Sequence, residues 1–140
     1  MLNQEDIKKI IPHRYPFLFI DGITEIEPLK RVVGFKKVRE DEYYFKGHFP
    51  EEPVMPGVLI LEAISQVGAA ALLVDETYKG KLILFAGADN VKFRRKVVPG
   101  DTLKLECDVL TLKRRFGSAQ GRAYVDDQLA CEAVIKFIIS

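Results

Sequence analysis

The chain lacks most of the residues from which metal centres and redox sites are built. Its 140 residues include two histidines, two cysteines and no tryptophan. Metal sites need several Cys or His ligands at close spacing, so we expect no metal site. Cys107 and Cys131 lie far apart with no CxxC pair, and we expect them to be buried free thiols. There is also no Gly-rich phosphate loop and no GxSxG nucleophile motif.

The chain also lacks an excess of charge of one sign. Lys and Arg number 21 and Asp and Glu number 20, a formal net charge of +1. Without a strong field, binding to nucleic acid or to a membrane surface is not expected. The N-terminus lacks the basic and apolar pattern of a secretory signal, so we expect a cytoplasmic protein. The longest apolar run, 58–74, contains Glu62 and polar residues, which favours a buried helix over a membrane span.

Composition and hydrophobic pattern predict one α+β domain over residues 1–140. Hydrophobic residues make up 48% of the chain, enough for one sizeable core. A short helix is expected over 3–11, and a long apolar helix from Pro56 to about Tyr78. The expected β-rich segments and strands are 17–27, 32–39, 43–46, 82–93, 102–112, 116–125 and 129–139.

Local signals refine two of these strands. Apolar and charged residues alternate over 102–109, which is typical of a half-buried antiparallel strand. The alternation shifts after Val109 and indicates a bulge or a strand end. Asp126-Asp127 is a candidate for a tight hairpin turn.

The long central helix is apolar nearly all round, so it must be covered on several sides. An antiparallel sheet curling round it would bury it, and so would a second subunit. Its few polar residues, Glu62, Ser65 and Gln66, are spaced so that they line one face.

One stretch of the chain brings together three parts that acid–base chemistry beside a carbonyl needs. His48 is a candidate general base, since histidine side chains titrate near neutral pH. Glu62 supplies a carboxylate on an otherwise apolar helix. The N–H groups of Gly57 and Val58 begin that helix with no capping side chain before them, so they suit an anion or a developing oxyanion.

Each of these residues also has a structural interpretation. Glu62 could face solvent or pair with an arginine, and Gly57 could belong to an ordinary Pro-Gly turn. A lone His48 could be structural. Their occurrence in one short segment favours catalysis. His13 has weaker support: it could line the mouth of a pocket or pin a turn, and we favour the turn.

Eight short motifs occur together along nearly the whole chain: IPHRYPF at 11–17, GHFP at 47–50, MPGV at 55–58, Glu62-Ala63, Gln66, FAG at 85–87, KFRR at 92–95 and PGD at 99–101. With these motifs the chain closely resembles the (3R)-hydroxyacyl-acyl-carrier-protein dehydratases of bacterial fatty acid synthesis, of the FabZ type. The resemblance implies the hotdog fold, in which an antiparallel sheet wraps one long central helix. It also implies homodimers or trimers of dimers, with His48 of one subunit paired with Glu62 of the other.

The implied reaction removes water from C2 and C3 of a (3R)-3-hydroxyacyl thioester to give the trans-2-enoyl thioester. The acyl group is carried on the phosphopantetheine arm of acyl carrier protein. His48 would take the C2 proton, the Gly57 N–H would stabilise the thioester oxygen, and protonated Glu62 would help the C3 hydroxyl leave. No metal or organic cofactor is implied.

The resemblance also implies residues that bind the substrate and its carrier. The substrate-binding residues are Gly57, Val58, Phe49 and Gln66. The candidate walls of an acyl tunnel are Phe49, Leu59, Ile60 and Phe85. The acidic carrier protein would dock on Arg94, Arg95 and Lys96. A second basic cluster, 113–115, is an alternative docking site.

Three other functions are weighed against simple dehydration. A bifunctional enzyme that also isomerises the trans-2 double bond to cis-3 would use the same residues, but isomerising members of the FabA type usually carry Asp at the position of Glu62. A hotdog thioesterase is a second alternative, because one fold hosts several activities. A non-catalytic acyl-binding module is the third.

Overall fold

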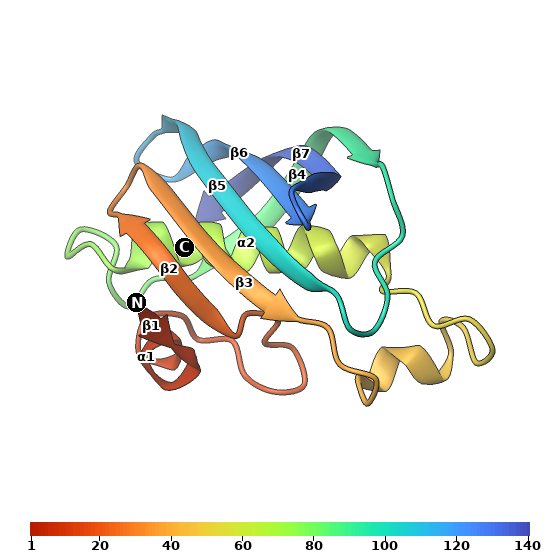
Figure 1. Ribbon diagram of the computed structural model, residues 1–140. Helices are drawn as coiled ribbons and strands as arrows, with labels where there is room; N and C mark the ends of the chain where they lie inside the picture. The colour runs from red at the N-terminus through yellow and green to blue at the C-terminus, as the bar shows by residue number, and fades with distance from the viewer.

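The computed structural model describes residues 1–140 as one curled sheet with one long helix (Figure 1). The helices are α1 (Gln4–Lys8), the 3-10 helix η1 (Tyr43–Lys46) and α2 (Gly57–Leu73). The strands are β1 (Leu2–Asn3), β2 (Gly22–Glu27), β3 (Arg31–Lys37), β4 (Ile83–Phe93), β5 (Thr102–Leu112), β6 (Phe116–Val125) and β7 (Gln128–Ile139).

The seven strands form an antiparallel sheet in the order β1-β2-β3-β5-β6-β7-β4. Helix α2 runs across the molecule behind β2, β3 and β5 in Figure 1. The expected α+β hotdog architecture is therefore confirmed. Strand β4 pairs only with β7, so its other edge is unpaired.

The sheet reaches close to α2, and eleven of the 17 residues of the helix are buried. Glycines make the close approach possible at two places. A Cβ on Gly34 of β3 would lie 2.9 Å from Cγ1 of Val67, and a Cβ on Gly121 of β6 would overlap Cγ2 of Ile64. At these two places the sheet packs directly against the apolar helix.

Two predictions are wrong in ways that side-chain interactions explain: the strand at 43–46 and the end of the long helix. Residues 43–46 form η1 and not a strand, because Tyr44 and Phe45 are both buried in the core and do not alternate between two faces. Helix α2 ends at Leu73 and not near Tyr78. Beyond it, the carboxylate of Asp75 accepts a hydrogen bond from the N–H of Thr77 at 3.0 Å, which competes with helical pairing.

The predicted β-rich segment 17–27 forms a strand only in its second half, and α1 is shorter than the predicted helix over 3–11. Asn3 caps α1 as expected, and its side chain accepts from the Asp6 N–H at 2.9 Å. Strand β2 starts only at Gly22. The preceding segment is held differently, because the N–H of Phe19 donates to the side chain of Gln66 in α2.

The expected local features of the C-terminal strands are confirmed. Asp126 and Asp127 both have positive φ, 48° and 65°, as a two-residue hairpin turn requires. The register of β5 against β6 shifts between Val109 and Thr111, as a bulge does. Cys107 and Cys131 are buried free thiols, and burial raises their pKa values to about 12 and about 11.

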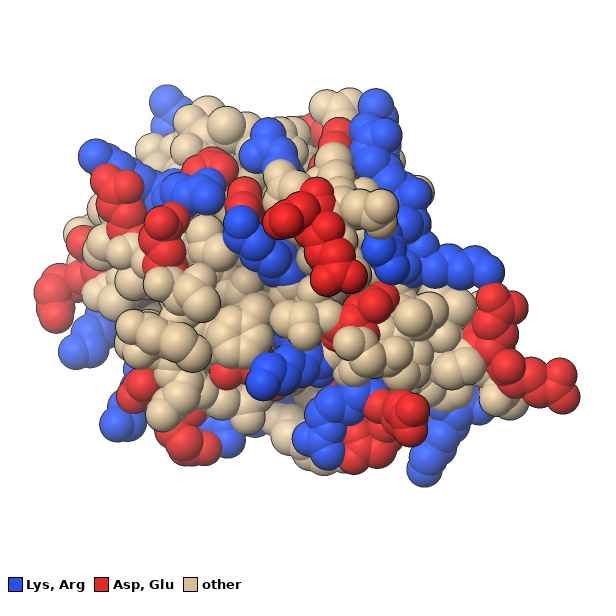
Figure 2. Space-filling model, in the orientation of Figure 1, with Lys and Arg blue, Asp and Glu red and all other residues tan.

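The surface carries both signs of charge. Acidic and basic side chains are interspersed over the face shown in Figure 2, although basic side chains gather on its right, over the segment that joins β4 to β5.

No group of three or more His, Cys, Asp or Glu side chains is placed to hold a metal ion. None of the helices combines the length and apolar character that crossing a membrane requires.

The contact between Gly121 and Ile64 can be tested by adding one methyl group. We expect Gly121→Ala to lower the free energy of unfolding by about 1–3 kcal/mol, because the core cannot accept the added carbon without shifting α2. Gly47→Ala is the matched control, since no atom lies within 4 Å of a Cβ there. Urea denaturation measures both, and an equal loss in the two variants would contradict the close packing.

Candidate active site

The imidazole of His48 is fixed by backbone contacts on the loop after η1. The backbone N–H of His48 donates to the carbonyl of Tyr44 at 3.1 Å, which ties the residue to η1. Its Nδ1 lies 2.7 Å from the carbonyl oxygen of Val54. Because a carbonyl can only accept, Nδ1 carries the hydrogen, and Nε2 of the neutral ring holds the free electron pair. The ring is therefore held in the tautomer that a general base at Nε2 requires.

The first turn of α2 presents unpaired N–H groups close by. Pro56 is the N-cap residue and makes no side-chain capping bond. The N–H groups of Gly57 and Val58 have no acceptor within the chain. A Cβ on Gly57 would lie 2.6 Å from the ring of Phe93, so only glycine fits there without moving that ring. The positive end of the helix dipole therefore keeps two N–H groups without a partner in the chain.

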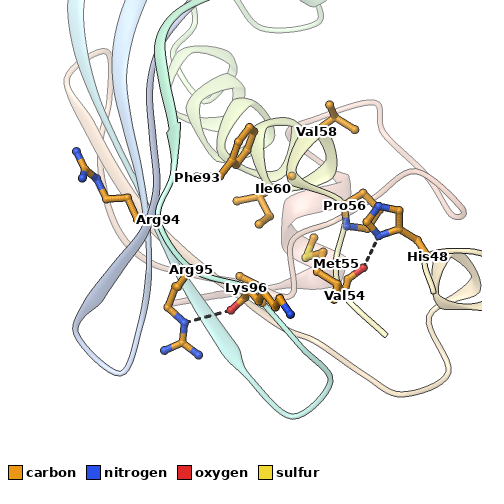
Figure 3. A pocket seen from close by; sticks show the side chains of 12 residues that line it. His48, Val54, Met55, Pro56, Val58, Ile60, Phe93, Arg94, Arg95 and Lys96 are labelled. Carbon is orange, nitrogen blue, oxygen red and sulfur yellow. Dashed lines mark hydrogen bonds between the residues drawn. The ribbon is translucent and has the colours of Figure 1, made fainter. Parts of the chain in front are cut away.

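His48 and the start of α2 line one open cavity of about 570 Å³ (Figure 3). In this view the His48 ring, Ile60 and Phe93 lie around the first turn of α2. The segment after β4 forms the other wall, and the side chain of Arg94 points away from the cavity. This cavity brings together a base candidate and an oxyanion candidate.

Glu62 lies in a different cavity, of about 220 Å³. Its Oε2 accepts a hydrogen bond from Nε2 of Gln66 at 2.9 Å. Gln66, only 1% exposed, also donates to the Phe17 carbonyl at 3.0 Å and accepts from the Phe19 N–H at 2.8 Å. Burial raises the pKa of Glu62, and the bond from Gln66 offsets part of that rise. The carboxyl group is therefore biased toward its protonated form.

His13 lines the Glu62 cavity, the less favoured of its two predicted roles, and its contact with Glu62 was not predicted. Its Nε2 is 3.7 Å from Oε2 of Glu62, and its Nδ1 is buried without a partner. Burial and the neighbouring Arg14 lower the pKa of His13, so the ring is biased toward neutrality. The motif at 11–17 was the available signal, but nothing in it indicates a contact with a residue 49 positions away.

Within one chain the structure does not bring His48 and Glu62 into the same cavity. Gly57 and Val58 lie with His48, whereas Gln66 lies with Glu62. Other predicted substrate-binding or tunnel residues are divided in the same way. Ile60 lines the His48 cavity and Phe85 the Glu62 cavity, while Phe49 is 51% exposed and stacks on the ring of His48.

The basic residues at the His48 cavity are paired with acids. Lys96 lies 2.7 Å from the carboxylate of Glu52, and Arg94 lies 3.3 Å from that of Glu132. Arg95 lies 3.6 Å from a carboxylate oxygen of Asp101. The other basic cluster, 113–115, forms no ion pair within the chain. It lies by a cavity of about 470 Å³ that Arg114, Arg115 and Lys81 line.

Comparison with known proteins decides the family. A model described as the FabA-like domain matches residues 11–134. The chain belongs to the FabA-like family. It is 56% identical over 138 residues to the 3-hydroxyacyl-acyl-carrier-protein dehydratase FabZ of Clostridium botulinum, covering 99% of this chain and 96% of that protein. The FabZ of Bacillus velezensis is 52% identical over 139 residues, which cover 99% of each protein. This chain is accordingly an enzyme of the dehydratase class, a hydro-lyase, and its resemblance to FabZ-type dehydratases is confirmed.

Solved structures with a similar fold share much less sequence with this chain. The dehydratase heterocomplex ApeI:P from Xenorhabdus doucetiae has a TM-score of 0.82 at 14% identity, covering 96% of this chain and 90% of the other. A hypothetical thioesterase from Streptococcus pneumoniae, solved with coenzyme A, has a TM-score of 0.63 at 12% identity, covering 84% of each. At these identities the likeness shows the hotdog fold alone.

The raised pKa of Glu62 predicts a pH-dependent stability. The folded state holds the Glu62 proton more tightly than the unfolded state. The protonated carboxyl group therefore stabilises the folded state fully below its ordinary pKa of 4.5. This stabilisation is lost as the pH rises through the raised pKa of the folded state. We therefore expect Glu62→Gln, which cannot ionise, to raise Tm by a few degrees at about pH 8 and to leave it unchanged at about pH 4.

The control for this measurement is Glu76→Gln, because the side chain of Glu76 is 90% exposed. Its Tm should differ from that of the unsubstituted protein by a similar amount at both pH values. A gain for Glu62→Gln that is equal at both pH values would contradict the raised pKa.

Proposed function

We propose that this enzyme removes water from (3R)-3-hydroxyacyl groups carried on acyl carrier protein, giving trans-2-enoyl groups in the elongation cycle of type II fatty acid synthesis. The observation that carries the proposal is the cavity that His48 shares with the uncapped start of α2. The names of the relatives at 52–56% identity supply the substrate and carrier.

His48 is the general base in this proposal. The Val54 carbonyl holds the hydrogen on Nδ1, so Nε2 is free to take the C2 proton of the substrate. The imidazolium that forms keeps its Nδ1–H bond to the same carbonyl, now strengthened by charge. The base therefore needs no change of tautomer or orientation during the step.

The N–H groups at the start of α2 stabilise the negative charge that builds on the thioester oxygen. Loss of the C2 proton moves electron density onto that oxygen, which makes nearby fixed donors most effective in the transition state. The N–H of Gly57 is the first candidate, because Gly57 begins α2 and this N–H has no acceptor within the chain. Val58 supplies a second donor at the same helix end.

Glu62 is the general acid. With its Oε2 accepting from Gln66, Oε1 is the oxygen left to hold the proton. That proton passes to the C3 hydroxyl, which leaves as water while the C2–C3 double bond forms. Gln66 acts on the substrate through Glu62, since its own amide is satisfied by the backbone of Phe17 and Phe19.

Two copies of the chain form each complete site. His48 and Glu62 line separate cavities of one chain, so a second chain must supply the missing partner. The unpaired edge of β4 is the natural place to join, because it is long and carries exposed apolar residues. These residues are Leu84, Phe85 and Phe93.

The acyl carrier protein docks beside the His48 cavity, on Arg94, Arg95 and Lys96. The position suits a carrier whose arm must enter that cavity, and Figure 2 shows basic side chains gathered over this segment. The cluster at 113–115 is the second candidate. Its cations have no acidic partner within the chain, so an acidic carrier would replace no existing ion pair there.

The same residues would support double-bond isomerisation as a side activity, since His48 and Glu62 could move a proton between C2 and C4. Simple dehydration is the first proposal because the acid is Glu. Passive acyl binding does not explain a base, an acid and an oxyanion site in one pair of cavities, and the relatives at 52–56% identity favour dehydration over thioester hydrolysis.

Mass spectrometry of a 3-hydroxyacyl carrier protein tests the proposal directly. We expect loss of one water with the unsubstituted enzyme and none with His48→Ala. Separation of the enoyl isomers in the same sample reports isomerisation. Release of the free carrier thiol would indicate a thioesterase, and an unchanged thioester bound by the folded protein would indicate an acyl-binding module.

The shared site is tested by mixing two inactive variants. We expect His48→Ala and Glu62→Gln each to be nearly inactive as homo-oligomers. After co-refolding in equal amounts, about one quarter of the sites in randomly paired dimers hold both residues, so a similar share of activity should return. Mixed dimers that form but stay inactive would contradict a site built from two chains.

The docking surface is tested by reversing charges. We expect Arg94→Glu with Arg95→Glu to lower kcat/KM for a carrier-linked substrate by about tenfold or more. A short pantetheine thioester, which has no carrier to dock, should lose much less. Arg114→Glu with Arg115→Glu is the matched control, and a larger loss there would assign docking to the 113–115 cluster.

A further inference from the structure

A second, smaller space lies behind the cavity that contains Glu62. The Glu62 cavity has about 220 Å³, and the inner cavity has about 10 Å³, which is room for roughly one water molecule. Three residues, Ser65, Ala69 and Ile83, line both cavities. They therefore form a neck between an open chamber beside the carboxylate and a nearly closed space deeper in the core.

The neck lies on a continuous stripe of α2. Glu62, Ser65, Ala69 and Leu72 follow one another at spacings of three and four residues, so they share one face of the helix. From Glu62 to Leu72 this stripe is about 15 Å long. The carboxylate marks its outer end and Leu72 its inner end.

The walls of the inner cavity are apolar. The strands contribute the side chains opposite the helix, which are Ile83, Cys107, Val109, Ala119, Ile135 and Phe137. No charged residue lines this space, and burial keeps the Cys107 thiol protonated by raising its pKa. A hydrocarbon chain is the ligand that such walls accept without loss of hydrogen bonds.

The inner cavity exists because the helix carries small residues where it faces these strands. A Cβ on Gly68 would already lie 2.9 Å from Sγ of Cys107. Ala69 is buried, and only its methyl group projects into the neck. Ser65 makes no side-chain hydrogen bond, so its hydroxyl does not fix it to another part of the fold. One or two added carbons at the neck would close it.

We propose that the neck formed by Ser65, Ala69 and Ile83 sets the longest acyl chain that this enzyme accepts. The proposal rests on the proposed dehydratase function, which places C3 of the substrate at Glu62. The acyl tail then runs along the stripe of α2 toward Leu72. Tails that end before the neck fill the outer chamber, and longer tails must pass the neck into a space with room for about one more methylene.

The neck predicts a change in chain-length profile when its width is altered. Each methylene that loses its apolar contacts should cost about fourfold in kcat/KM, from about 0.8 kcal/mol per buried CH₂. We expect Ala69→Val and Ser65→Val to shorten the longest chain used efficiently and to leave short chains unaffected. Ile83→Ala, which widens the neck, should shift the limit in the opposite direction.

The experiment measures kcat/KM for 3-hydroxyacyl carrier proteins of increasing acyl length. Ala71→Val is the matched control, because Ala71 is a buried residue of the same helix that lines neither cavity. The Ala71→Val variant adds the same two methyl groups as Ala69→Val, and its chain-length profile should parallel that of the unsubstituted enzyme. Ser65→Val keeps the test available if Ala69→Val fails to fold, since Ser65 is only half-buried.

Unchanged profiles in both narrowing variants and in Ile83→Ala would overturn the proposal, as would an equal shift in Ala71→Val. An unsubstituted protein that dehydrates no chain length would instead contradict the proposed function. The neck is then tested by binding of saturated acyl carrier proteins of the same lengths. The longest chain bound should shift in the same directions, and no shift would reject the neck.

Discussion

The structure depends on covering one helix that has almost no polar face. A helix of this kind costs free energy wherever it meets water, so the chain must surround it. The sheet covers α2 from one side, closely enough that Gly34 and Gly121 have no room for a Cβ. The remaining stripe carries Val58, Glu62 and Ser65. The proposed acid, Glu62, lies on this stripe.

Gln66 converts this packing constraint into a functional one. Its amide is buried and uses its carbonyl and both N–H donors on the backbone of Phe17, the backbone of Phe19 and the carboxyl of Glu62. Loss of any of these bonds would leave a buried polar group unsatisfied, at a cost of about 1–3 kcal/mol. The carboxyl group of Glu62 is therefore oriented by the same amide that attaches the N-terminal segment to the central helix.

Much of the fold could be predicted from local sequence, and the failures have physical causes. The strands after residue 82 were predicted within a residue or so because their residues alternate in polarity and Asp126-Asp127 breaks the chain sharply. The segment 43–46 was mistaken for a strand because aromatic residues favour strands, whereas both Tyr44 and Phe45 turn into the core. The end of α2 was misplaced because the Asp75 bond to Thr77 competes with helix propensity.

Part of the candidate site could likewise be predicted from local sequence, and part could not. His48 and the start of α2 lie close in sequence, so their common cavity could be predicted from a turn followed by an uncapped helix. The contact between His13 and Glu62 could not, since it joins residues 49 positions apart. Separation of His48 and Glu62 into two cavities is a property of the folded chain that no local pattern encodes.

The unpaired edge of β4 has a consequence for how a newly made chain survives. The edge strand is eleven residues long and exposes Leu84, Phe85 and Phe93. Its unpaired backbone groups could pair with another extended segment. A chain that has folded but found no second copy is therefore exposed to misassociation, and dilute, slow synthesis prolongs that interval. The edge proposed to complete the active site is also the place where a solitary chain begins to aggregate.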